Sequence, residues 1–68
     1  MRAEYDAEVD ALYVRLTPAK VSESEEVRPG IVFDFDDEGR LVGIEILDAS
    51  EHLAKDADLK SLAPPAAA

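Results

Sequence analysis

The carboxylates between residues 34 and 45 have a spacing that could hold a metal cation. Their pattern approaches a calcium-binding EF-hand loop, with four acidic residues and one turn glycine: Asp34, Asp36, Glu38, Glu45 and Gly39. The chemistry would be hard carboxylate oxygens around one cation. Glu38, however, replaces the usual aspartate or asparagine, and the flanking residues alternate as strands do, whereas an EF-hand needs flanking helices. The pattern therefore favours an ordinary hairpin turn, and we predict no metal site and no cofactor.

A second group of polar side chains could carry acid–base or nucleophilic chemistry. The acidic turn of Asp6, Glu8 and Asp10 could transfer protons if burial separated the pKa values of its carboxyl groups. His52, the single histidine, could act as a general base only with an orienting partner and a nucleophile beside it. No nucleophile motif surrounds Ser50, the nearest serine. We therefore predict no catalytic residues, and a small hydrolase-like enzyme using His52 or the acidic turn is the alternative.

Period-two alternation indicates the strands that would carry these residues. In residues 31–35 apolar side chains alternate with other side chains, and residues 41–47 repeat this pattern after an acidic turn over 36–39. Residues 2–5 form a short strand candidate, and residues 11–16 are rich in residues that favour strands. These four segments predict antiparallel pairing through short turns.

Residues 21–28 are harder to assign. Their charges suit a solvent-facing edge strand, because charged edges prevent unwanted pairing, and a disordered loop is the alternative. The period changes at Asp48, which with Glu51 three positions later fits a capping box at the start of a helix. We expect this helix to end near Lys55 and a short turn to follow over 58–62.

These elements predict an α+β fold, an antiparallel β-meander of four to five strands with a C-terminal helix packed on one face. We expect a single domain over residues 1–62 and a flexible tail over 63–68. The core candidates are the apolar residues of the strands and the helix: Leu12, Val14, Phe33, Phe35, Val42, Ile44, Ile46 and Leu53. The facing of the last two strands depends on a register that the sequence leaves open.

The composition limits the partners. The chain has 68 residues and a formal net charge of −9, which repels nucleic acids and anionic membranes but attracts a basic protein. It has no cysteine, which excludes disulfides and thiolate metal sites. No apolar run reaches the roughly 18 residues of a membrane span, and we expect a cytoplasmic protein. We therefore predict a non-enzymatic protein–protein interaction module that binds a basic partner.

A second copy of the chain is the other partner that the sequence predicts. A chain this short buries only about 60% of its unfolded surface, and oligomerisation is one way to gain stability. Residues 11–16 and 41–47 carry apolar side chains on both faces, so one helix would leave an apolar patch uncovered. We therefore predict a homodimer through the uncovered sheet face or an edge strand; a purely structural homodimer without a ligand is a further alternative. The predicted interface residues are Tyr5, Tyr13, Leu41 and Leu47.

Four segments of the chain form a combined pattern: residues 5–14 (YDAEVDALYV), 26–31 (EVRPGI), 34–36 (DFD) and 39–50 (GRLVGIEILDAS). The pattern resembles a small bacterial family, domain-of-unknown-function family 2283, over about residues 3–53. This resemblance implies a compact antiparallel sheet with a C-terminal helix, and it brings no catalytic residues. Members are proposed to lie beside small toxin-like proteins, so the resemblance implies an antitoxin-like role for an acidic partner.

Overall fold

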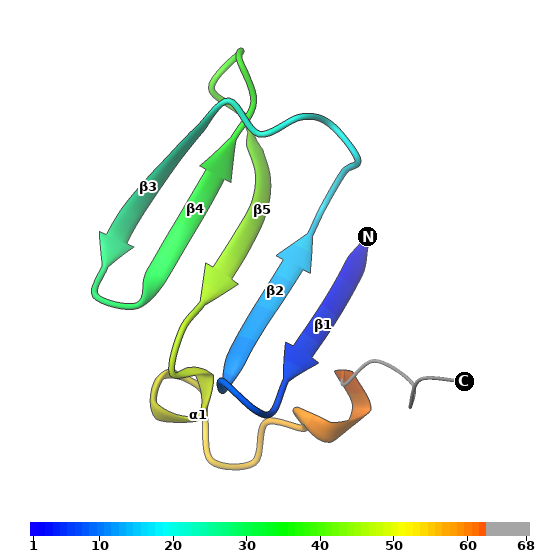
Figure 1. Ribbon diagram of the computed structural model, residues 1–68, viewed down its shortest axis with the longest axis vertical. Coiled ribbons are helices and arrows are strands. Elements are labelled where there is room, and N and C mark those ends of the chain that lie inside the picture. Colours follow the sequence, from blue (N-terminus) through cyan, green and yellow to red (C-terminus); the bar gives the residue numbers. More distant parts are fainter. Residues whose placement is uncertain (63–68) are drawn as a thin grey trace.

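The computed structural model describes residues 1–62 and shows one five-stranded antiparallel sheet followed by two short helices (Figure 1). The strands are β1 (Arg2–Asp6), β2 (Ala11–Arg15), β3 (Glu23–Arg28), β4 (Ile31–Phe35) and β5 (Leu41–Ile46). They are followed by the α-helix α1 (Ala49–His52) and the 3-10 helix η1 (Lys60–Leu62). The predicted α+β class and the antiparallel sheet are therefore confirmed.

The strands lie in the order β1-β2-β5-β4-β3. β3, β4 and β5 form a continuous meander, and β1 and β2 form a hairpin that joins the meander where β2 pairs with β5. The chain after β2 therefore crosses the end of the sheet before β3 begins at the far edge (Figure 1). This connection departs from a strict meander because the apolar strands β2 and β5 lie side by side and leave the charged β3 at the edge. Residues 21–28, for which a strand and a loop were both considered, contain the edge strand β3.

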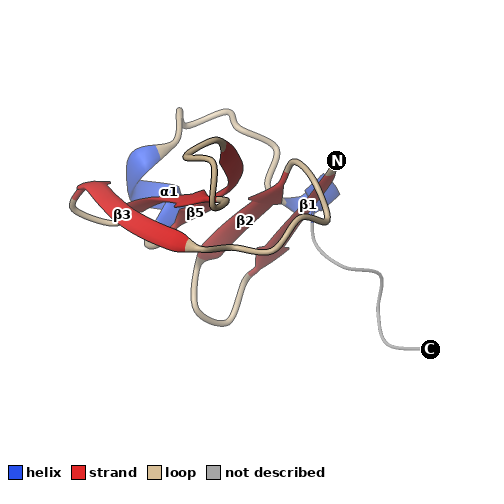
Figure 2. Ribbon diagram, turned by 90° about the horizontal axis from the view of Figure 1, so that it is seen from above, coloured by secondary structure: helices blue, strands red, loops and turns tan. Residues whose placement is uncertain are grey.

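The register divides the sheet into two faces. The apolar face consists of alternate residues of the three central strands: Leu12, Val14, Ile31, Phe33, Phe35, Val42, Ile44 and Ile46. The polar face carries the residues between them. On the apolar face only Leu12 and Val42 are buried, with 6% and 0% of their surface exposed, and the other side chains are half-buried. Seen from above, the strands form a single layer (Figure 2), so within residues 1–62 no second sheet lies across this face.

The helix begins where predicted but is shorter and lies beyond the ends of the strands (Figure 1). It ends at His52 rather than near Lys55 and does not lie across a sheet face. The predicted capping box is absent, because Asp48 adopts a left-handed φ of 52° and makes no side-chain capping hydrogen bond. Instead the backbone N–H of Ala49 donates to the carbonyl oxygen of Asp10 at 2.8 Å. The start of α1 is thus held by the β1–β2 turn.

The turn predicted over 58–62 contains η1, which contacts β1. The predicted flexible tail over 63–68 lies outside the described residues. Within residues 1–62, no helix is long and apolar enough to cross a membrane.

Candidate functional site

One edge of the sheet is open and acidic. β3 is the last strand in the sheet order, and all six of its side chains are exposed. Three of them, Glu23, Glu25 and Glu26, define what we name the acidic edge. Because an edge strand is paired on one side only, its outward N–H and C=O groups can accept a further strand. The acidic edge therefore combines an open backbone with a local excess of negative charge.

The chain holds β3 in place from both ends. Before β4 the backbone reverses at Gly30, where φ is +85°, a value that is rare for other residues. A side chain at this position would also place its Cβ 2.7 Å from Nε2 of His52. After β3, the backbone N–H of Leu47 donates a hydrogen bond to the carbonyl oxygen of Gly30 at 2.7 Å. Before β3, the backbone N–H of Ser22 donates one to the carbonyl oxygen of Phe35, also at 2.7 Å. These bonds fix the paired side of β3 while its outer side faces solvent.

The four carboxylates with EF-hand-like spacing do not gather at one site. Asp36 accepts hydrogen bonds at 2.9 Å from the backbone N–H groups of Glu38 and Arg40, so it closes the β4–β5 turn. Asp34 lies within β4 and Glu45 within β5. Among residues 1–62, no group of three or more Asp, Glu, His or Cys side chains is arranged to hold a metal ion. The spacing in the sequence is that of two paired strands and the turn between them.

The polar face contains a buried carboxylate that the sequence did not identify as buried. Asp34 is 2% exposed and accepts hydrogen bonds from Oγ of Ser24 at 2.6 Å and from Oη of Tyr13 at 3.3 Å. The Tyr13 hydroxyl itself accepts a hydrogen bond from Nη1 of Arg15 at 3.2 Å. The Tyr13 hydroxyl lies close to Gly43, since a Cβ there would be 3.4 Å from Oη. We name Tyr13, Arg15, Ser24 and Asp34 the Asp34 cluster.

Glu45 lies beside the Asp34 cluster on the polar face, where it is paired with Tyr13 on one side and Val32 on the other. A hydrogen bond with Asp34, partial burial and the charge of Asp34 raise the pKa of Glu45 above its usual value of 4.5. The nearby Asp34 carboxyl therefore favours the protonated form of Glu45. This arrangement can bind a proton, but it brings no nucleophile into the site.

A second carboxylate joins the β1–β2 turn to α1. Asp10 accepts hydrogen bonds at 2.6 Å from the hydroxyls of Tyr5 and Ser50, and a third at 3.1 Å from the backbone N–H of Ser50. The pKa of Asp10 is lowered below 3.8, mainly by the hydrogen bond from the Ser50 hydroxyl. The pKa of Tyr5 is raised above 10.0, mainly by the hydrogen bond from its own hydroxyl to Asp10. These three residues, which we name the Asp10 cluster, clamp the turn to the helix.

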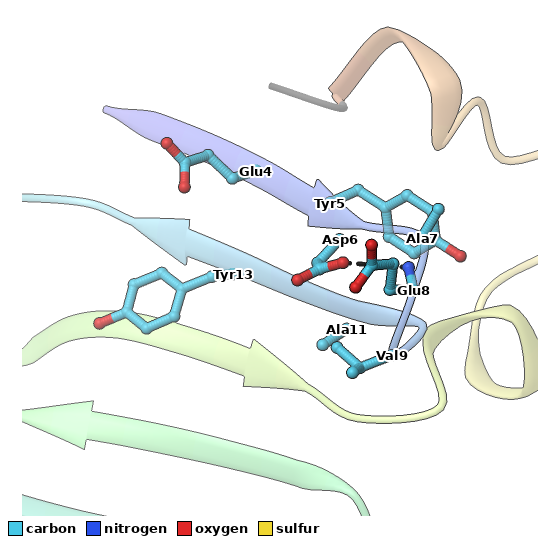
Figure 3. Close-up of a pocket in the computed structure, with 8 residues that line it drawn as sticks. All are labelled: Glu4, Tyr5, Asp6, Ala7, Glu8, Val9, Ala11 and Tyr13. Atoms are coloured by element: carbon cyan, nitrogen blue, oxygen red, sulfur yellow. Dashed lines mark hydrogen bonds between the residues drawn. The ribbon is translucent and has the colours of Figure 1, made fainter. Parts of the chain in front are cut away.

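An open hollow of about 520 Å³ lies against the β1–β2 hairpin (Figure 3). Its lining includes two carboxylates of the predicted acidic turn, Asp6 and Glu8. Oδ1 of Asp6 accepts a hydrogen bond from the backbone N–H of Glu8 at 3.0 Å. Both side chains are exposed, so neither has the burial that an acid–base pair needs. The structure thus separates the predicted turn, because Asp10 belongs to the clamp while Asp6 and Glu8 remain at the surface.

His52 and Ser50 do not form a base–nucleophile pair. The imidazole of His52 lies against Gly30, whereas the Ser50 hydroxyl donates to Asp10. His52 and Ser50, which the hydrolase alternative would pair, therefore contact different groups.

The four residues predicted for an interface lie in different surroundings. Tyr5 is half-buried and, by its pairing with Leu12, lies on the apolar face, whereas Tyr13 lies on the polar face. Leu41 is half-buried at the start of β5, and Leu47 is 47% exposed after its end. No single surface therefore contains all four residues.

Fold and site together define a small α+β domain built on one antiparallel sheet, with two polar clusters that serve the fold and one open acidic edge. A family model described as "Protein of unknown function (DUF2283)" matches residues 2–50. The chain belongs to this family, as its sequence pattern indicated. No curated protein and no solved structure matched the chain.

Proposed function

We propose that this protein is a non-enzymatic interaction module that binds a basic protein partner along the acidic edge, as an antitoxin-like component would. The observation that carries the proposal is the exposure of all six side chains of β3, which is one of the two edge strands of the sheet. An extended segment of a partner can add to such an edge through main-chain hydrogen bonds, while side chains provide the specificity.

The charges on and beside β3 favour a basic partner. Three glutamates lie within four positions of the strand: Glu23, Glu25 and Glu26. The hydrogen bond from Ser22 to Phe35 places the start of β3 beside the end of β4. The acidic β4–β5 turn over 36–39 begins there. A second copy would meet like charges at this edge, whereas a basic strand would be attracted and steered to it.

The polar clusters support a binding role over a catalytic one. Ser50 donates its hydroxyl to Asp10, and Ser24 donates its hydroxyl to Asp34. Each hydroxyl therefore bonds to a carboxylate within the fold rather than to an imidazole that could activate it.

Affinity capture from the native host tests the proposal with two charge-matched variants. In the edge variant, Glu23→Lys and Glu25→Lys reverse two charges on β3. In the control variant, Glu8→Lys and Glu51→Lys make the same change in net charge at exposed positions away from that strand. We expect wild type and control to retain a stoichiometric basic protein, and the edge variant to lose it.

Reconstitution with the purified partner then measures the salt dependence of the complex. Raising the ionic strength should weaken it, because opposite charges attract across the interface. A neighbouring gene for a toxin-like protein would identify the partner directly. Recovery of no basic partner, or equal retention by the edge variant, would overturn the proposal.

A further inference from the structure

The central strands present a continuous uncharged surface on the apolar face. In the first row across the sheet, Leu12 lies opposite Ile46, which lies opposite Ile31. In the second row, Val14, Ile44 and Phe33 are aligned in the same way. The central strands β2, β5 and β4 thus contribute six apolar side chains and no charge to these two rows.

This surface is incompletely covered by its own chain. Five of the six side chains in the two rows are only half-buried; Leu12 alone is buried. Phe33 and Phe35 contact each other edge to face, with ring centroids 6.4 Å apart, and both remain half-buried. When the sheet is viewed face-on, α1 lies beyond the strand ends and η1 lies beside the end of β1, which it contacts (Figure 1). Domains normally bury such a face beneath a second layer, and in residues 1–62 the chain supplies one layer only.

We propose that a second copy of this chain covers the apolar face in a two-fold symmetric dimer, so that two sheets pack face to face. This proposal does not depend on the proposed function, which uses the edge of the sheet rather than its face. Five strands about 4.8 Å apart, with about 18 Å of length each, give about 430 Å² of flat area. Specific interfaces need about 600 Å² of accessible surface per partner. Interlocking side chains make accessible area larger than flat area, so the face belongs with the small interfaces of weak complexes.

The charges at the sides of the face select the arrangement of the two copies. β3 places Glu23 and Glu25 on the apolar side, because they pair with Phe35 and Phe33, and β1 places uncharged residues there. A two-fold axis parallel to the strands sets β3 of each copy over β1 of the other, which keeps the glutamates apart. An axis across the strands would set β3 over β3 and oppose like charges. The first arrangement places Tyr5, on β1, within the interface, and Tyr13, on the polar face, outside it.

Light scattering and sedimentation equilibrium test whether the dimer exists. At about 100 μM, well above a micromolar dissociation constant, we expect twice the monomer mass, falling to the monomer mass on dilution. Each copy carries a net charge of −9, so raising the ionic strength should strengthen the dimer by screening repulsion. A monomer mass at about 100 μM in both low and high salt would overturn the proposal. The opposite salt response separates this dimer from the complex with a basic partner, so either can fail without the other.

Single cysteine variants test whether the apolar face is the interface. The chain has no cysteine, and Val14 and Val32 are half-buried valines on opposite faces of the sheet. Val14→Cys and Val32→Cys are small changes that the fold should tolerate, and the thiol reaction rate reports exposure. We expect the rate for Val14→Cys to fall with rising protein concentration, in step with the monomer fraction, and the rate for Val32→Cys to stay constant. Equal protection of both thiols, or protection of Val32→Cys alone, would exclude the apolar face.

Discussion

Replacing Glu45 with glutamine tests whether the fold places two carboxylates unfavourably close on the polar face. The pKa of Glu45 is raised, first by its hydrogen bond with Asp34 and then by burial, so the folded protein binds that proton more tightly than the unfolded chain. The contribution of Glu45 to stability should therefore be greatest below pH 4.5, the unfolded value, and should be lost as the pH rises through the folded pKa. At a pH above the folded pKa of Glu45, the Glu45→Gln variant lacks a negative charge that folding disfavours. The substitution should therefore stabilise the protein at that pH.

The magnitude is small because solvent screens the pair. Glu45 is only half-buried, and coupling between such exposed charges is about 0.2–1 kcal/mol. We expect Glu45→Gln to raise the free energy of unfolding by about 0.5 kcal/mol at neutral pH. With a urea m-value of about 1 kcal/mol per molar, the unfolding midpoint would rise by about 0.5 M. At a pH below 4.5 the gain should vanish, because the carboxyl is then protonated in both states.

Urea unfolding followed by far-ultraviolet circular dichroism, at neutral and acid pH and at one protein concentration, measures this effect. Glu8→Gln is the matched control, since Glu8 is exposed in the β1–β2 turn and its replacement makes the same change in net charge. Any general relief of the net charge of −9 appears in both variants. Equal midpoint shifts for the two variants at neutral pH, or a shift for Glu45→Gln that persists in acid, would contradict this prediction.

Three further predictions follow from close contacts. Gly43→Ala should lower the free energy of unfolding by about 1–3 kcal/mol, because its Cβ would lie 2.9 Å from the Val14 carbonyl oxygen; an unchanged urea midpoint would contradict that contact. Asp10→Ala should speed amide hydrogen exchange at Ser50, which loses its acceptor, whereas Asp10→Asn keeps an acceptor oxygen and should exchange more slowly than the alanine variant. The hydrogen bond to Asp10 raises the pKa of Tyr5 above 10.0, so its contribution to stability should be lost as the pH rises above that value. Tyr5→Phe should remove this part of the alkaline transition, as measured by thermal unfolding against pH.

The strands could be predicted because side-chain alternation is a local property. The alternation in residues 31–35 and 41–47 placed β4 and β5 to within a residue, and the charges of residues 21–28 correctly favoured an edge strand. The pairing of β2 with β5 was not predicted, since it depends on which apolar strands meet rather than on any one segment. The signal was nevertheless present: a strand of exposed charges belongs at an edge, and the most apolar strands belong at the centre.

The polar clusters were missed because their partners are distant in the sequence. The capping box at Asp48 and Glu51 is a local pattern, yet the carboxylate that accepts from the Ser50 backbone belongs to Asp10 in the first hairpin. Asp34 was considered only as part of the EF-hand-like spacing, in a segment assigned to an ordinary hairpin, whereas its register opposite Gly43 places it within hydrogen-bonding distance of the Tyr13 hydroxyl. Neither arrangement can be derived before the order of the strands is known.

The two faces of the sheet differ in what a partner could add to them. On the polar face, the Asp34 cluster satisfies its own hydrogen bonds, and within residues 1–62 no buried side-chain nitrogen or oxygen lacks a hydrogen-bond partner. Covering that face would remove water from charged groups without supplying missing bonds. On the apolar face, half-buried side chains such as Phe33 and Ile44 gain free energy only when more of their surface leaves water. We therefore expect a partner to cover the apolar face, because the buried polar groups of the opposite face already have their hydrogen bonds.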